Sequence, residues 1–222
     1  MLKLLTIADA FSLLNASFGF LAIFSILFDE QRLSFSFIFL ALLADGLDGI
    51  IARRWGGGKM GEPLEAMADM LSLSIAPLLF GLWFAIRVYS VDHIVILFSL
   101  SAGFVFLICS AIRLASFRVL KDQSFFVGLP ASVSTILIVG FAYLHVDISV
   151  YLIIILVLSV AMISSIKFPK PSIHINIVAS MLIVLTLGLY TTFSNISIIL
   201  LLIAMFFYSI VGPIYLIKSS RK

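Results

Sequence analysis

Charged residues are scarce in this sequence. Asp, Glu, Lys and Arg together make up 11% of its 222 residues, whereas 63% are hydrophobic and 21 are Phe. Soluble domains carry roughly 25% charged residues, so a water-exposed surface along the whole chain is excluded. The composition predicts a polytopic membrane protein. Because no polar stretch is long enough for a separate soluble domain, residues 1–222 are expected to form a single membrane domain.

Several kinds of site are also missing. Cys109 is the only cysteine, which excludes an intramolecular disulfide. His93, His145 and His174 lack the spacing of metal ligands, and each lies near the end of an apolar run. The glycines of Gly56-Gly57-Gly58 lack the spacing of a phosphate-binding loop. These absences leave the carboxylates as the side chains most able to carry chemistry.

The apolar residues gather in eight runs that could each cross a bilayer as a helix, which takes about 20 residues. The runs are continuous, without the alternation typical of a transmembrane β-barrel. The expected fold is therefore all-α, a bundle of transmembrane helices. Because the sixth and seventh runs are the shortest, six or seven spans is the alternative count. The eight expected spans are Leu5–Phe28, Leu33–Ala52, Leu64–Ile86, Ile94–Ala115, Val127–His145, Ile148–Ser165, Ile175–Thr192 and Ile196–Ile217.

The basic residues are distributed unevenly over the connections between these runs. With the N-terminus in the cytoplasm, twelve of the 14 Lys and Arg residues fall on the cytoplasmic side, and only Arg32 and Arg87 fall on the other. Lys and Arg gather in the cytoplasmic loops of membrane proteins, so both termini are expected in the cytoplasm. This topology also explains the net charge of +3 without a nucleic-acid partner.

One acidic stretch interrupts the apolar pattern. Asp45 and Asp48 are three residues apart near the end of the second expected helix, and Glu65 and Asp69 are four apart near the start of the third. Residues at these spacings share a helix face, and the short glycine-rich connection makes the two helices antiparallel neighbours. The four carboxylates are therefore expected to converge near the cytoplasmic surface. A carboxylate inside a membrane costs about 2.5–3.5 kcal/mol on insertion scales, which marks a functional site.

Four converging carboxylates disfavour one another's charged forms. Oxygen ligands suit hard divalent ions such as Mg²⁺ or Mn²⁺. Two such ions could offset the charge and clamp a phosphate, which favours phosphoryl-type transfer. Arg53 suits a phosphate through its planar guanidinium. The alternative is structural, with the carboxylates pairing with Arg53 and Arg54. Small residues leave room for a ligand or another helix beside the cluster: Gly46, Gly49, Ala52 and Gly61.

The order of these residues resembles the signature of the CDP-alcohol phosphotransferase family. That signature is Asp-x2-Asp-Gly-x2-Ala-Arg, a spacer of seven or eight residues, and Gly-x3-Asp-x3-Asp. Here it reads Asp45-x2-Asp48-Gly49-x2-Ala52-Arg53, seven residues, and Gly61-x3-Glu65-x3-Asp69. Seven of the eight positions match, and Glu65 stands where the family has its third Asp.

The resemblance implies an enzyme that binds two divalent ions, Mg²⁺ or Mn²⁺, and the CDP group of a CDP-linked lipid. An acceptor alcohol attacks the β-phosphate, and CMP leaves. It also implies a homodimer in the cell membrane whose active site faces the cytoplasm. Asp69 would be the general base as well as a metal ligand. The implied metal ligands are Asp45, Asp48, Glu65 and Asp69, and the implied CDP-lipid-binding residues are Asp48, Gly49, Ala52, Arg53 and Gly61.

Further stretches are similar to the serine-transferring branch of the family: Leu71–Pro77, Arg113–Arg118, Phe126–Pro130 and Ser165–Lys170. A serine acceptor carries a carboxylate, which Arg binds through two parallel hydrogen bonds. Arg113 and Arg118 are therefore the expected acceptor-binding residues. As alternatives, both arginines anchor to lipid headgroups or hold a polyol phosphate. The expected reaction makes a phosphatidylserine-like lipid from L-serine, with either an acyl or an isoprenoid donor.

Three other functions are alternatives to this one. The same transfer to inositol phosphate or glycerol phosphate is the nearest alternative. An ion-coupled transporter would use the carboxylates as a relay, but the cluster lies at one membrane edge and no charged relay continues through the later spans. An aromatic prenyltransferase would lack the Gly-x2-Ala-Arg part of the pattern.

The first expected helix adds no clear part of the site. Asp9 and Asn15 are six residues apart and do not share one clean helix face. Asn15 is expected either to reach the nucleotide pocket or to make a packing hydrogen bond between helices.

Overall fold

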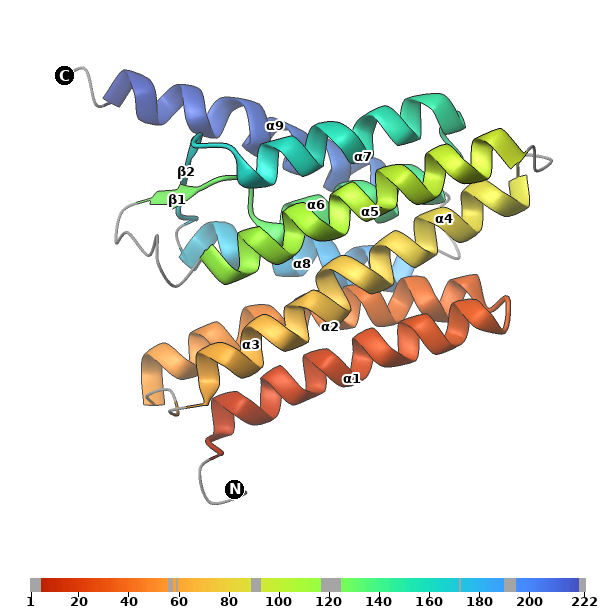
Figure 1. The fold of residues 1–222 in the computed structure, drawn as a ribbon. Coiled ribbons are helices and arrows are strands. Elements are labelled where there is room, and N and C mark those ends of the chain that lie inside the picture. Colours follow the sequence, from red (N-terminus) through yellow and green to blue (C-terminus); the bar gives the residue numbers. More distant parts are fainter. Residues whose placement is uncertain are drawn as a thin grey trace. The chain divides into compact units, whose positions relative to one another are not determined.

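The computed structural model describes residues 5–55, 58, 60–88, 93–116, 125–171, 173–189 and 195–219 (Figure 1). Helices dominate it, and α3, η2 and α4 follow one another without a break. The elements in chain order are α1 (Ile7–Leu27), α2 (Gln31–Trp55), α3 (Gly61–Asp69), η2 (Met70–Ile75), α4 (Ala76–Val88), α5 (His93–Ser116), β1 (Phe125–Val127), α6 (Ala131–Tyr143), α7 (Ile148–Ile163), β2 (Lys167–Pro169), α8 (Ile173–Leu189) and α9 (Ile196–Ser219).

The helices have the length and hydropathy of membrane spans. Five helical segments in the described part of the chain are long and apolar enough to cross a bilayer, and three shorter apolar helices accompany them. Each of the eight predicted spans overlaps one of these segments. The prediction of a polytopic membrane helix bundle is confirmed. The long segments are Ile7–Leu27, Gln31–Ala52, Gly61–Phe84, His93–Ser116 and Ile196–Leu216.

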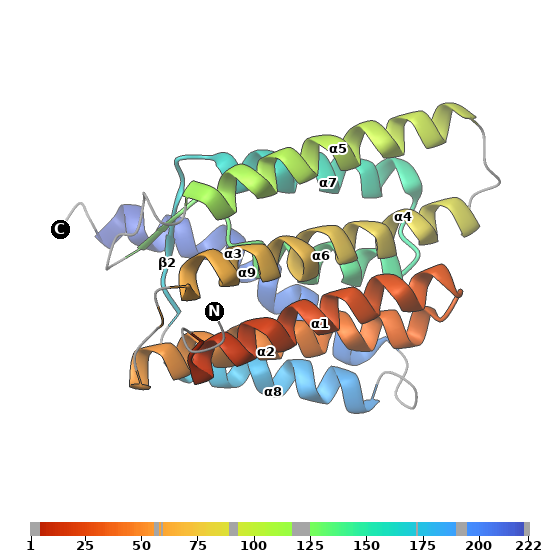
Figure 2. The ribbon, with the colours of Figure 1, turned by 60° about the horizontal axis from the view of Figure 1, so that its bottom comes forward.

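The chain divides into two compact units, Met1–Trp83 and Phe84–Lys222. In the first unit, α1 and α2 form a helical hairpin and lie side by side in both Figure 1 and Figure 2. Thr6 begins α1 with a capping box, because its side chain accepts a hydrogen bond from the Asp9 backbone while the Asp9 carboxylate accepts one from the Thr6 backbone. The same helix also packs against α3 and η2.

The π-helical segment η2 was not predicted, since the sequence indicated a regular helix over 64–86. It directly follows Asp69 and lies against α1 at Gly19. A Cβ atom at Gly19 would lie 2.7 Å from the Cα atom of Ser72, a distance that only glycine tolerates. Single π-helical turns inside α-helices are frequent at functional sites.

In the second unit, α5 packs against α7, and α6 packs against α7 and α9. Two short strands accompany the helices. β1 pairs antiparallel with β2, with Phe126 opposite Phe168 at the centre of the register. Gly212 of α9 touches this ribbon, because a Cβ atom there would lie 2.9 Å from Cδ of Pro169.

The predicted span Val127–His145 is therefore wrong at its start. Val127 belongs to β1, and α6 begins only at Ala131. Two residues account for the break. Gly128 has a φ of +78°, which is in the left-handed region that favours glycine. Pro130 is extended, with φ −61° and ψ 141°, and is the N-cap residue directly before α6.

Replacing Gly128 with Ala is expected to destabilise the second unit. A side chain in the left-handed region costs about 1–2 kcal/mol, and the new Cβ atom would also collide with the Met162 carbonyl oxygen. The apparent unfolding temperature in detergent should fall by about 4 °C or more. Gly188→Ala is the matched control, because no described atom lies within 4 Å of a Cβ atom there. Equal unfolding temperatures for the two variants would contradict the packing described at Gly128.

Candidate active site

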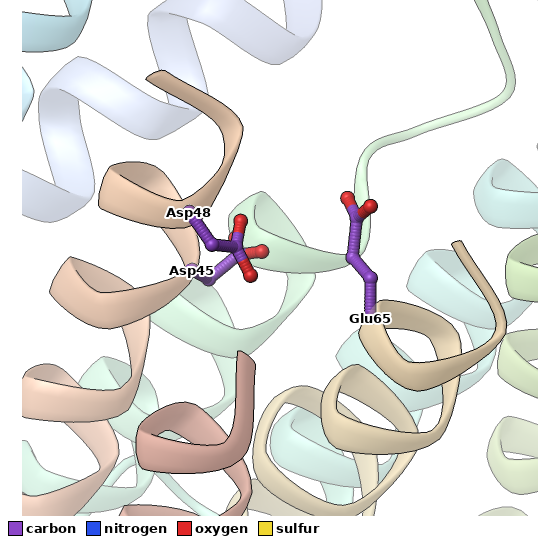
Figure 3. A group of neighbouring side chains, drawn as sticks. All are labelled: Asp45, Asp48 and Glu65. Carbon is purple, nitrogen blue, oxygen red and sulfur yellow. The ribbon is translucent and has the colours of Figure 1, made fainter. Parts of the chain in front are cut away.

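Three of the four predicted carboxylates form a compact group. Asp45 and Asp48 project from α2 and Glu65 from α3, and one oxygen of each lies within 4.8 Å of the other two (Figure 3). Asp48 is buried, with 3% of its surface exposed, whereas Asp45 and Glu65 are half-buried. The spacings of three residues in α2 and four in α3 place each pair on one helix face. The two helices therefore bring their acidic faces together.

Asp69 joins this group from one turn further along α3. Its side chain is 9% exposed, and it interacts electrostatically with Asp45, Glu65 and Asp48. Four carboxyl side chains thus meet within the first unit, as the sequence predicted. The name "carboxylate cluster" is used below for Asp45, Asp48, Glu65 and Asp69.

The carboxylate cluster has the donor atoms of a site for a divalent ion. Opposite oxygens around Mg²⁺ lie about 4.2 Å apart, because each Mg–O distance is about 2.1 Å. Adjacent oxygens around the same ion lie only about 3 Å apart, so the oxygens of Asp45, Asp48 and Glu65, which lie within 4.8 Å of one another, would have to move closer together to bind one ion. Carboxylate oxygens are the ligands that such hard ions prefer. The residues present therefore fit a Mg²⁺ or Mn²⁺ ion.

Polar side chains of the first helix reach the carboxylate cluster; a hydrogen bond between helices was one of the two expectations for Asn15, whereas Ser12 was not predicted to take part. Asp9 and Asn15 were predicted not to share a face, yet both side chains are completely buried. Asn15 Nδ2 donates a hydrogen bond of 2.9 Å to Asp69 Oδ1, and Ser12 Oγ donates one of 2.7 Å to Asp48 Oδ2. The available signal in the sequence was the three-residue spacing of the polar residues at 9, 12 and 15 in an otherwise apolar run.

The predicted nucleotide-binding residues lie around the carboxylate cluster on the same two helices. Gly49 and Ala52 are half-buried in α2. Gly61 begins α3 beside α1, and a Cβ atom there would lie 3.1 Å from Asp9 Oδ1. Gly46 is different, because no described atom lies within 4 Å of a Cβ atom at that position, so helix packing does not require a glycine there. Arg53 belongs to α2, but its side chain lies outside the described part of the structure.

Three of the four stretches that resemble the serine-transferring branch belong to the second unit, whereas Leu71–Pro77 belongs to the first. Arg113 is buried near the end of α5, and its Nε donates a hydrogen bond of 3.2 Å to the Leu129 carbonyl oxygen. Leu129 follows β1, which pairs with β2, and Tyr208 of α9 donates a hydrogen bond of 2.8 Å to the Pro169 carbonyl oxygen. Segments near residues 113, 129 and 169 thus form one connected region. Arg118 lies outside the described residues.

Comparison with known proteins decides the family. The family described as CDP-alcohol phosphatidyltransferase matches residues 5–214, nearly the whole chain. The chain belongs to the CDP-alcohol phosphatidyltransferase family. The protein is therefore a transferase of this family.

Several individual proteins are similar in sequence to this chain over most of its length. The CDP-diacylglycerol–serine O-phosphatidyltransferase of Methanocaldococcus jannaschii is 33% identical over 169 residues, which is 76% of either chain. The archaetidylserine synthase of Methanothermobacter thermautotrophicus is 32% identical over 75% of this chain and 70% of its own. The CDP-diacylglycerol–serine O-phosphatidyltransferase of Bacillus subtilis is 30% identical over 68% of this chain and 82% of its own.

Replacing Gly61 with Ala is expected to disturb the contact between α1 and α3. The new methyl group would press against Asp9 Oδ1, which is buried and has no hydrogen-bond partner among the described residues. Overpacking of this kind costs about 1–3 kcal/mol, so the apparent unfolding temperature should fall by at least about 2 °C. Gly46→Ala, at the position next to Asp45, places its methyl group in open space and should not lower the unfolding temperature. A Gly61→Ala protein as stable as Gly46→Ala would contradict the close approach of the two helices.

Proposed function

We propose that this protein transfers the phosphatidyl-type group of a CDP-linked lipid to the hydroxyl group of L-serine and releases CMP, as a step of phospholipid biosynthesis. The observation that carries the proposal is the carboxylate cluster on α2 and α3, in a family member whose relatives are named as serine transferases or an archaetidylserine synthase. The transferred group is diacylglycerol phosphate or archaeol phosphate.

The carboxylate cluster is proposed to hold two divalent ions, Mg²⁺ or Mn²⁺. Asp45, Asp48 and Glu65 supply the closest set of oxygens, and Asp69 completes the site. When bound, such ions supply positive charge that offsets the charge of the diphosphate in the transition state. Glu65 is one methylene longer than the Asp of the family signature, and one of its carboxylate oxygens lies within 4.8 Å of oxygens of Asp45 and Asp48.

Asp69 is proposed to act as the general base. It accepts the proton of the serine hydroxyl while that oxygen forms a bond to the β-phosphorus of the CDP-lipid. The bond between this phosphorus and the oxygen that bridges it to CMP breaks, and CMP leaves with the electron pair. Asn15 holds Oδ1 of Asp69 through a hydrogen bond, which restrains the carboxylate in the position from which it acts.

Each of the two substrates is assigned to its own group of residues. The CDP-lipid is proposed to bind along the signature residues of α2 and α3, namely Asp48, Gly49, Ala52, Arg53 and Gly61. The serine carboxylate is proposed to bind Arg113 and Arg118. In support, the Arg113 guanidinium is buried beside the Gly128-Leu129-Pro130 stretch, where a carboxylate would find a fixed cationic partner.

The placement in the membrane follows from the basic residues. We propose that both termini and the carboxylate cluster face the cytoplasm, because twelve of the 14 Lys and Arg residues then lie on that side. The protein is proposed to be a homodimer in the cell membrane, as the family resemblance implies.

A direct assay tests the reaction and its base together. Purified protein in detergent, given CDP-diacylglycerol or CDP-archaeol and Mn²⁺, should release CMP when L-serine is added. Asp69→Asn should lower the rate by about 10²–10⁴-fold, the usual contribution of a general base. The matched control is Glu30→Gln, which changes an exposed carboxylate at the α1–α2 turn. It should keep the wild-type rate.

The outcomes separate the parts of this proposal. Release of CMP with inositol phosphate or glycerol phosphate but not with L-serine would overturn the acceptor. No release with any acceptor would overturn the reaction itself. Turnover by Asp69→Asn close to the wild-type rate would remove Asp69 from the role of base.

Glu65 offers a test of the metal assignment. Glu65→Gln removes one negative charge from the cluster while keeping its shape, so the Mn²⁺ concentration that gives half-maximal activity should rise by about 10-fold or more. Glu65→Asp restores the residue of the family signature and should change that concentration far less. If Glu65→Gln needs no more Mn²⁺ than the wild type, Glu65 is not a ligand.

A further inference from the structure

The buried face of α1 carries polar side chains at Asp9, Ser12 and Asn15, whose exposed fractions are 0%, 3% and 0%. In a helix made of apolar residues, burying such groups is costly unless each has a partner. Ser12 and Asn15 find their partners outside their own helix. Ser12 Oγ donates to Asp48 Oδ2 on α2 at 2.7 Å, and Asn15 Nδ2 donates to Asp69 Oδ1 on α3 at 2.9 Å.

The bond made by Ser12 is unusual for this helix. A buried helical serine ordinarily donates to the carbonyl oxygen four residues before it. Ser25 of α1, which is buried, does so at 2.7 Å to Leu21, and Ser17, which is exposed, does so at 2.8 Å to Leu13. Ser12 instead donates to a side chain 36 residues away. Its hydroxyl therefore serves the carboxylate cluster and not its own helix.

The two donors act on different halves of the cluster. Asp48 belongs to α2 and Asp69 to α3, so α1 is joined to both acidic helices by one hydrogen bond each. Both donors are neutral and add no charge to the site, but each fixes one oxygen of a carboxylate and thereby the direction of the other. Gly19 lets α1 approach Ser72 of η2 closely, on the side of α1 that packs against the same part of the chain.

We propose that Ser12 and Asn15 are positioning residues of the carboxylate cluster: they orient Asp48 and Asp69 so that the four carboxylates can bind a divalent ion together. This inference rests on the proposed function for its identification of the ion site. Hydrogen-bond partners that orient metal ligands typically change metal affinity by about 10–100-fold when they are removed. The inference therefore predicts a loss of metal affinity that does not depend on turnover.

Binding of Mn²⁺ alone tests Ser12. The full chain in detergent is titrated with Mn²⁺, and the free ion is followed by electron paramagnetic resonance. Ser12→Ala should bind Mn²⁺ about 10-fold more weakly than the wild type. Ser12→Thr keeps the hydroxyl and should restore the affinity. Ser17→Ala, which removes a hydroxyl that serves only the backbone of the same helix, is the matched control and should bind as the wild type does.

Asn15 is tested by kinetics on the same preparations. Asn15→Leu should lower kcat by roughly 10²-fold, the cost of misplacing a catalytic group by about 1 Å, while KM for the CDP-lipid stays within about twofold of the wild-type value. A purely structural role would instead lower the amount of folded protein, measured by size-exclusion chromatography, without changing kcat per folded molecule. If this variant does not fold, the Mn²⁺ titration of the three serine variants decides the inference.

The results distinguish this inference from the proposed function. Wild-type affinity in Ser12→Ala, or no binding of Mn²⁺ by the wild type, would overturn the inference, whatever reaction the enzyme catalyses. Mn²⁺ binding that weakens in Ser12→Ala, in a protein that releases no CMP with L-serine, would support the inference and overturn the proposed function.

Discussion

Mutual repulsion among four carboxylates is the constraint on which the first unit depends. Asp45 and Asp48 on α2 face Glu65 and Asp69 on α3, and negative charges at this separation disfavour one another. Packing of apolar helix faces does not by itself favour a position that brings these four carboxylates together. A divalent cation reverses the sign of the interaction, because the same oxygens then bind a common ion. A bound cation would thus offset the cost of bringing these four carboxylates together.

The rest of the unit serves to hold these charges in place. α1 lies against α2, α3 and η2, and small residues let it approach closely, with Gly61 against Asp9 and Gly19 against Ser72. From this position it donates neutral hydrogen bonds to one carboxylate on each acidic helix. The catalytic chemistry proposed for Asp69 thus depends on a helix that carries none of the family signature.

Local spacing explains what could be predicted from the sequence. The three-residue and four-residue spacings of the acidic pairs, and the apolar runs that form the helices, are local patterns. Contacts between distant residues have no such pattern. The bonds from Ser12 and Asn15 span 36 and 54 residues, so the sequence left open whether Asn15 faces the site and did not single out Ser12 at all. The pairing of β1 with β2 also joins segments that are far apart in the sequence. Val127 was predicted as part of a helix because it is apolar, but Gly128 and Pro130 separate it from α6.

Anomalous X-ray diffraction at the manganese absorption edge would test the central claim most directly. Crystals of the protein grown with Mn²⁺ and a CDP-linked lipid should show anomalous density within coordination distance of oxygens from Asp45, Asp48 and Glu65, with the lipid diphosphate on the same ions. Anomalous density elsewhere, with these three carboxylates bound to no ion, would contradict the account.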